Sequence, residues 1–175
     1  MVVSYYDKME NLFIANCTLK YTPSNTIVYA YNGQVIGVGA GQQNRVDCVK
    51  IAGNKAVNWW KRQSPCIIDA NFPQNTKRQE KVNYIMAFIN SNETENEFFS
   101  KTHKDHSHME NIRTQNIVMA SDAFFPFPDS IDLCYIKGVK YIIQPGGSIA
   151  DKNVINRCNE YGIGMCFTGV RMFYH

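Results

Sequence analysis

The stretch from Ser121 to Asp129 is chemically the most unusual part of the sequence, because three phenylalanines and two prolines stand between two aspartates. A rigid apolar wall that ends in a carboxylate suits a flat heterocycle, whose ring lies on the aromatics while the carboxylate accepts two N–H bonds from its edge. The alternative is a core strand followed by a helix whose N-cap is Asp129 or Ser130. Both interpretations are open at this point.

Two glycine-rich segments each follow an expected strand and precede an expected helix. They are Gly37–Gln42 and Gln144–Ser148. Backbone N–H groups at a helix start can hold an anion. The first segment lacks the spacing and the later acidic residue of a dinucleotide-binding fingerprint, so glycines that allow close packing of strand on helix are favoured. For the second segment, a tight turn with Ser148 near the helix cap explains the pattern equally well.

Three histidines at positions 103, 106 and 108 stand close together with Asp105. Such a cluster could hold zinc. A solvated surface segment is the favoured interpretation, because the cluster lies among charged residues and no cysteine is near it. We therefore expect no metal site.

The last five residues, Arg171–His175, include two aromatic side chains. An aromatic chain end is expected to pack on the protein rather than fray. A docked Arg171 would need an anion as its partner.

The elements that position these residues can be predicted from apolar patterns. Strands are expected at Thr26–Tyr31 and Gln34–Val38, joined by an Asn-Gly hairpin turn. The β-branched and apolar residues at Cys17–Leu19 suggest another strand. Apolar residues three or four apart from Val46 to Trp60 predict a helix that packs along one face.

Residues from about 61 to 117 are polar and charged, and we interpret them as an insertion outside the main sheet. Val82, Ile85, Met86 and Ile89 predict one amphipathic helix in it, and Phe98-Phe99 suggest a second. The pattern then becomes regular, with an apolar stretch at 117–125, a helix near 130–137, a strand at 139–144, a helix near 150–161 and a strand at 164–168. Alternating strands and helices predict an α/β layered domain whose later strands are parallel.

Length and composition limit the classes of protein. The 175 residues suit one domain, and a hydrophobic content of 45% excludes disordered and collagen-like chains. A net charge of +3 is too small for a dedicated nucleic-acid binder. No apolar run is long enough to span a membrane, and the start lacks a signal-peptide pattern. Six scattered cysteines without a CxxC pair favour reduced thiols and a cytosolic protein.

Several motifs occur in an order that is typical of one family. They are Tyr21–Asn25, Asn32–Arg45, Trp59-Trp60, Ser121–Asp129, Gln144–Asp151 and Arg171–His175. Together they resemble the C-terminal part of the bifunctional purine-biosynthesis proteins, in which AICAR transformylase is joined to IMP cyclohydrolase. The resemblance spans nearly the whole chain except the insertion.

The resemblance implies a three-layer α/β/α, cytidine-deaminase-like fold with a mixed sheet. Residues 1–175 would form the second half of the transformylase domain. The implied reaction moves a formyl group from 10-formyltetrahydrofolate to the 5-amino group of AICAR during IMP biosynthesis.

The resemblance also implies residue roles. Asn25 and Arg45 would contact the carboxamide side of AICAR, Phe124 would line the same pocket, and Arg171 would reach the phosphate. A guanidinium suits a phosphate because its fork of donors stays charged. Asn25 would have a supporting role in catalysis.

The folate co-substrate would be bordered by residues from the helix start and two loops. They are Val46, Asp129, Ser148 and Ile149, with Asp129 contacting the pterin edge. The resemblance further suggests a monovalent cation near Thr22, Ser24 and Asp122.

Some family features are missing from this sequence. The family has a Lys-His pair in the first transformylase half, where the histidine acts as general base, whereas this chain has no Lys-His dipeptide. We therefore expect a fragment that ends at the natural C-terminus, lacks the cyclohydrolase domain and is inactive alone. Pro128 stands where the family often has a basic residue.

The family active site draws on two subunits, so a homodimer is expected for the parent protein. The alternative hypothesis is a non-catalytic binding module for a phosphorylated heterocycle or folate.

Overall fold

The computed structural model describes residues 5–90, 112 and 115–173. The chain divides into two compact units, one formed by residues 1–57 and 113–175 and the other by residues 58–112. The predicted insertion at 61–117 overlaps the second unit. That the chain is one half of a transformylase domain stays a prediction.

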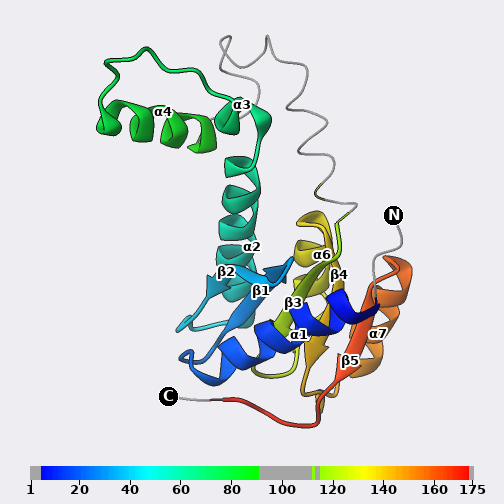
Figure 1. Cartoon of the computed structure of the whole chain (residues 1–175). Helices are drawn as coiled ribbons and strands as arrows, with labels where there is room; N and C mark the ends of the chain where they lie inside the picture. The colour runs from blue at the N-terminus through cyan, green and yellow to red at the C-terminus, as the bar shows by residue number, and fades with distance from the viewer. Residues whose placement is uncertain (1–4, 91–111, 113–114, 174–175) are drawn as a thin grey trace. The chain divides into compact units, whose positions relative to one another are not determined.

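The described elements follow one another in the order drawn in Figure 1. In the first unit they are α1 (Tyr5–Lys20), β1 (Ile27–Tyr31), β2 (Gln34–Gly39), the start of α2 (Arg45–Arg62), β3 (Ile117–Ser121), α6 (Asp129–Ile136), β4 (Val139–Gln144), α7 (Asp151–Glu160) and β5 (Gly164–Phe167). The second unit contains the end of α2, α3 (Pro65–Ile68) and α4 (Arg78–Asn90).

The five strands form one mixed sheet in the order β2-β1-β3-β4-β5. β1 is antiparallel to both β2 and β3, whereas β3, β4 and β5 are parallel. The predicted α/β class, the mixed sheet and the parallel later strands are therefore confirmed.

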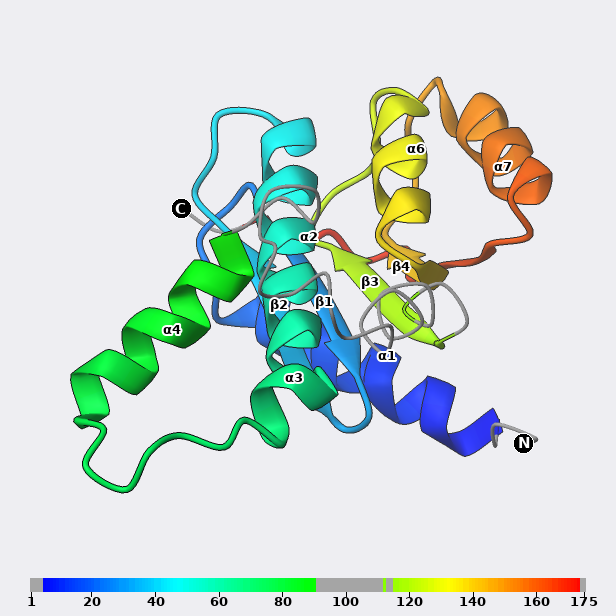
Figure 2. The same ribbon diagram turned by 90° about the horizontal axis from the view of Figure 1, so that it is seen from above.

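Helices cover both faces of this sheet. Figure 2 shows α1 on one face and α6 and α7 on the other, on the same side as α2. On the α1 face, a buried cluster is formed by Leu12, Ala15 and Leu19 with alternate residues of β1 and β3. The first unit thus has three layers, as expected from the resemblance, although the specific cytidine-deaminase-like fold stays a prediction.

The strand predicted at Cys17–Leu19 is wrong, because these residues form the last turns of α1. Their neighbours Leu12 and Ala15 are buried with Leu19, at a spacing that suits a helix packed on the sheet. Within this helix, the Thr18 hydroxyl donates a hydrogen bond to the Ile14 carbonyl at 2.9 Å, four residues earlier in the chain. Tertiary packing has overridden the β propensity of a short apolar run.

The predicted hairpin turn between β1 and β2 is confirmed. Asn32 and Gly33 both have positive φ, at 49° and 73°, as the type I′ turn requires. The Gly33 N–H donates to the Asn11 side chain at 2.8 Å, which ties the turn to α1.

Two glycines of β2 allow α2 to lie directly on the strand. A Cβ at Gly37 would stand 2.2 Å from the Ala52 carbonyl oxygen, and a Cβ at Gly39 would stand 2.2 Å from the Cys48 carbonyl oxygen. These glycines therefore serve close packing, which the sequence favoured over a dinucleotide site.

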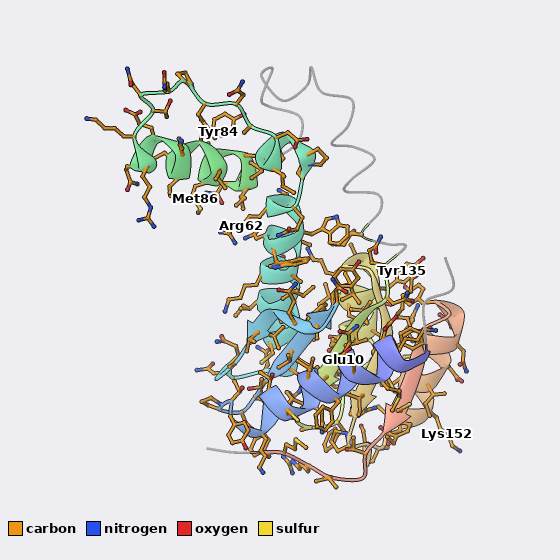
Figure 3. The ribbon with its side chains drawn as sticks, in the orientation of Figure 1. Glu10, Arg62, Tyr84, Met86, Tyr135 and Lys152 are labelled. Atoms are coloured by element: carbon orange, nitrogen blue, oxygen red, sulfur yellow. The ribbon has the colours of Figure 1, made fainter. Side chains whose placement is uncertain are left out.

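The second unit contains the predicted amphipathic helix, which is α4. Ile89 is buried on it, and Met86 accepts a weak contact at 3.9 Å from Arg62 (Figure 3). The Phe72 and Tyr84 rings meet edge to face at 5.2 Å between centroids. The suggested helix at Phe98-Phe99 and the histidines at 103, 106 and 108 lie outside the described residues.

Candidate functional site

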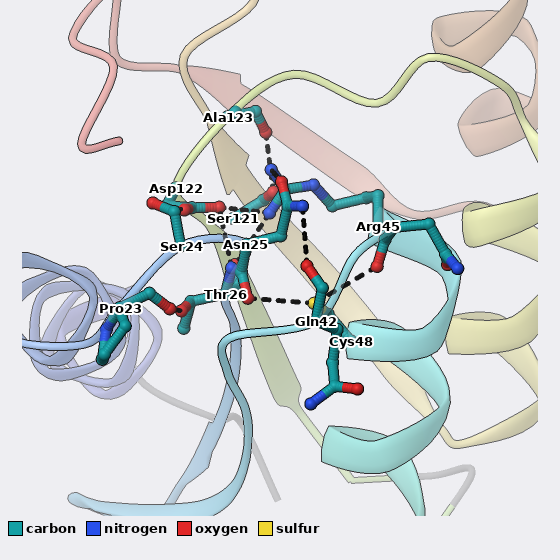
Figure 4. A network of polar contacts seen from close by, with 11 residues as sticks. Pro23, Ser24, Asn25, Thr26, Gln42, Arg45, Cys48, Ser121, Asp122 and Ala123 are labelled. Carbon is teal, nitrogen blue, oxygen red and sulfur yellow. Dashed lines mark hydrogen bonds and ion pairs between the residues drawn. The ribbon is translucent and has the colours of Figure 1, made fainter. Parts of the chain in front are cut away.

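A buried polar network lies where β3 ends and β1 begins. The antiparallel register pairs Ile27 with Ser121, so the residues just before β1 meet the residue just after β3. Arg45, the first residue of α2, joins them from a third segment. Figure 4 shows Ser24, Asn25, Arg45 and Asp122 converging at this point.

Asp122 is fully buried and is the centre of the network. Its Oδ2 accepts a hydrogen bond from the Ser24 hydroxyl. Its Oδ1 accepts from the Thr26 backbone N–H at 3.1 Å and from Nη1 of Arg45. A buried carboxylate is tolerated only when it is paired and hydrogen-bonded, and these contacts supply both conditions.

Arg45 is also buried, and its guanidinium joins the aspartate to an amide. Besides the ion pair with Asp122, Nη1 donates to the Thr26 carbonyl at 3.0 Å. Nη2 donates to Oδ1 of Asn25 at 2.9 Å, and Nδ2 of Asn25 donates to the Gln42 carbonyl at 2.9 Å. The orientation of the Asn25 amide is therefore fixed at both ends.

Cys48 lies on α2 about one turn after Arg45 and contacts the network through Asn25. Its thiol donates to the Asn25 carbonyl at 3.0 Å. Burial raises the pKa of this thiol, and the nearby Arg45 charge only partly opposes that effect. A neutral thiol is a poor nucleophile, so Cys48 is suited to packing and hydrogen bonding rather than covalent chemistry.

The C-terminal segment is attached to the same aspartate. The Met172 N–H donates to the Asp122 carbonyl at 2.9 Å, and the Met172 side chain packs against the core cluster beneath α1. The neighbouring Arg171 is exposed, with its guanidinium carbon 4.3 Å from the centroid of the Phe173 ring. The prediction that this chain end is docked is confirmed at Met172.

The Ser121–Asp129 segment contributes to both the core and the surface. Phe125 is fully buried, Phe124 is half-buried and Phe127 is 64% exposed. Asp129 is exposed, and its Oδ1 accepts the Ser130 N–H at 2.7 Å. The alternative N-cap assignment is wrong, because the cap position of α6 is Pro128 and has no side-chain cap bond.

The loop after β4 donates backbone N–H groups to the carboxylate of Asp151, the first residue of α7. Oδ2 of Asp151 accepts the N–H groups of Gly147 at 2.8 Å and Ser148 at 3.1 Å. These donors are therefore not free for an external anion, and the tight-turn interpretation of this segment is favoured. Ser148 is half-buried, and Ile149 is fully exposed beside it.

The structure brings some of the predicted site residues together. Asn25 and Arg45 are hydrogen-bonded to each other directly. Arg171 is connected to them indirectly, because its neighbour Met172 donates its backbone N–H to Asp122. Val46 is half-buried next to Arg45. Asp129 is the first residue of α6, where the loop after β3 ends, and Ser148 stands on the loop after β4. Carboxyl ends of parallel strands share one edge of a sheet, so these two loops lie at the same edge.

The sequence did not indicate the central role of Asp122. The available signal was a charged residue directly after an expected strand. In the structure, all five residues of that strand are buried. The suggested cation near Thr22, Ser24 and Asp122 stays a prediction. In the structure, both carboxylate oxygens of Asp122 accept hydrogen bonds from protein donors. Among the described residues, no cluster of His, Cys, Asp and Glu could hold a metal ion.

Two further findings concern classes that the sequence excluded. Within the described part of the chain, no helix is long and apolar enough to cross a membrane. The five cysteines whose side chains are described, at positions 17, 48, 134, 158 and 166, are free thiols.

Comparison with known proteins supports the motif resemblance. Residues 4–55 match the model of the AICARFT/IMPCHase bienzyme family. Over 169 residues the chain is 36% identical to the bifunctional purine biosynthesis protein PurH of Aquifex aeolicus (strain VF5). This alignment covers 97% of the chain and 23% of the relative, so the chain spans about a quarter of that protein's length. The resemblance to this family is confirmed.

Proposed function

Because this chain is related to part of the AICARFT/IMPCHase bienzymes, we propose that it is a segment of an AICAR formyltransferase. In the complete protein, a formyl group would pass from 10-formyltetrahydrofolate to the 5-amino group of AICAR. The observation that carries the proposal is the buried network at Asp122, because it joins four of the motif blocks on which the resemblance depends.

The AICAR contacts would come from Asn25, Arg45, Phe124 and Arg171. A guanidinium has five N–H donors, and in the network Arg45 uses only those on its two Nη atoms. Its Nε is buried and has no hydrogen-bond partner among the described residues, so one of the five donors is unsatisfied. The exposed guanidinium of Arg171 suits a phosphate, which it can contact with two parallel hydrogen bonds.

The folate contacts would come from Val46, Asp129, Ser148 and Ile149. The exposed carboxylate of Asp129 can accept N–H groups from the edge of a pterin. The exposed Phe127 and Ile149 side chains offer apolar surface on the loop that leads to Asp129 and on the loop that contains Ser148. This arrangement supports a flat ring system at the carboxyl edge of the parallel strands.

The proposed reaction requires a general base from another part of the parent protein, because this chain has no Lys-His pair. General acid–base catalysis typically contributes about 100- to 10,000-fold, so the chain alone should be nearly inactive even if it binds both ligands. In this proposal, the parent protein would be a homodimer in the cytosol and would also contain an IMP cyclohydrolase domain.

The first experiment is calorimetry of the 175-residue chain with AICAR and with a folate analogue, beside a transformylase assay of the full-length parent. We expect a parent that catalyses formyl transfer and a chain that does not. An inactive parent at saturating substrates, with soluble dimer confirmed, would refute the proposal. Micromolar binding by a stable chain whose parent lacks transferase activity would instead support the binding module.

Two substitutions in the parent separate the proposed ligand roles. Asp129→Asn should raise the KM for folate more than the KM for AICAR, and Arg171→Ala should do the reverse. Loss of one charged hydrogen bond predicts effects of about tenfold or more. Equal changes in both KM values for either variant would contradict the assigned roles.

A further inference from the structure

We propose that Asp122 is the positioning residue of the AICAR side of the site. In this role it holds Asn25, Arg45 and the segment with Arg171 in one arrangement, without contacting the ligand itself. The inference rests on the proposed function, since that function assigns the ligand contacts to these three residues.

The side chain of Asp122 fixes two of the three residues. Its carboxylate pairs with Nη1 of Arg45, and Nη2 of the same guanidinium binds Oδ1 of Asn25. Because a guanidinium is planar and rigid, fixing Nη1 also fixes the direction of Nη2. The position of the Asn25 amide is thus determined by a carboxylate that it does not contact.

The main chain of Asp122 fixes the third residue. Its carbonyl accepts the Met172 N–H at 2.9 Å, one residue from Arg171, and its own N–H donates to the Thr26 carbonyl at 3.3 Å. Asp122 therefore bonds to the segment before β1, to the start of α2 and to the C-terminal segment. These segments are far apart in the sequence.

Burial makes Asp122 suited to positioning rather than to contact with a ligand. Its side chain has no exposed surface, whereas Arg171 is exposed and Asn25 is half-buried. Hydrogen bonds between charged groups are directional and are stronger away from water, so they hold the attached groups with little freedom.

The test compares Asp122→Asn, which keeps the shape and removes the charge, with Asp132→Asn as the matched control. Asp132 is another aspartate of the same unit, on α6, where it accepts the Tyr161 hydroxyl at 2.8 Å. Calorimetry is performed on the folded 175-residue chain with AICAR and with a folate analogue. We expect Asp122→Asn to weaken AICAR binding by about tenfold to a hundredfold and folate-analogue binding by less than about threefold.

A purely structural role would lower both affinities together, or lower the folded fraction alone, and either result would overturn the inference. Unchanged AICAR binding in Asp122→Asn would also overturn it. The control variant should bind both ligands as the wild type does.

A second measurement separates this inference from the proposed function. If the wild-type chain binds neither ligand, the proposed function fails for this chain, and the positioning role is decided by ¹⁵N NMR of the Arg45 guanidinium and the Asn25 amide. Loss of hydrogen-exchange protection at both groups in Asp122→Asn, but not in Asp132→Asn, would support the role. Unchanged protection would overturn it.

Discussion

The guanidinium of Arg45 and the carboxylate of Asp122 form an ion pair with almost no exposed surface on either side chain. The two residues are 77 positions apart in the sequence and stand at the start of α2 and the end of β3. A buried ion pair contributes little net stability when complete, yet removal of one partner leaves an uncompensated charge.

Arg45→Ala should therefore lower the free energy of unfolding by about 3 to 5 kcal/mol, measured by urea denaturation. Lys50→Ala is the matched control, because Lys50 lies on the same helix and pairs with Asp47 at 3.7 Å with both side chains exposed. The control should change stability by less than about 0.5 kcal/mol. Similar losses in both variants would show that burial of the Arg45 pair has no energetic consequence.

Gly39→Ala should destabilise the protein by about 3 kcal/mol, the upper end of the usual cost of overpacking, because its Cβ would stand 2.2 Å from a backbone carbonyl of α2. Gly41→Ala provides the comparison. Gly41 has φ of +65° and no atom within 4 Å of the added Cβ, so only backbone strain of about 1 to 2 kcal/mol is expected. Thermal unfolding of the two variants would contradict this account if Gly41→Ala were the more damaging.

The stability of the protein should fall as the pH rises above 9. Burial raises the pKa of Cys158 from 9.0 to about 11, so the folded state holds this proton more tightly than the unfolded state. The resulting stabilisation is fully present below the unfolded-state pKa and is lost as the pH rises through the folded-state value. Urea denaturation between pH 8 and pH 11 should show a steeper decline for the wild type than for Cys158→Ala. Parallel curves would exclude this contribution.

Met172→Ala should release the C-terminal segment. The Met172 side chain packs on the core cluster, so its loss should speed trypsin cleavage after Arg171 by about tenfold, equivalent to roughly 1.4 kcal/mol. Val170→Ala, at a side chain that is 59% exposed, should leave the rate unchanged. Rates are compared after normalisation to free peptides of the same sequences. Equal rates in the wild type and Met172→Ala would mean that Met172 does not anchor the segment.

The parts of this fold that could be predicted from the sequence depend on local signals. The Asn32-Gly33 turn predicted the hairpin because its backbone conformation is specific to few residue types. The alternation of strands and helices after residue 117 predicted the parallel part of the sheet. Cys17–Leu19 was misassigned because a run of three residues has no measurable period, and contact with the sheet decided its conformation.

The candidate site was only partly predictable, for a different physical reason. The resemblance supplied Asn25 and Arg45, but no local pattern indicates that a carboxylate 77 residues away pairs with the arginine. That pairing follows from the antiparallel register of β1 and β3, which places Thr26 beside Asp122. Strand register is set by packing over the whole sheet, so a local stretch of sequence does not determine it.

The close contact of α2 with β2 has a consequence for the site as well as for stability. Carbonyls one helical turn apart, at Cys48 and Ala52, face Gly39 and Gly37, so the helix cannot slide along the strand without a backbone clash. The depth at which Arg45 enters the network is thus set by two residues that have no side chain. A search for functional positions by chemical type would pass over both glycines, although a methyl group at either one would shift the guanidinium relative to any ligand that it binds.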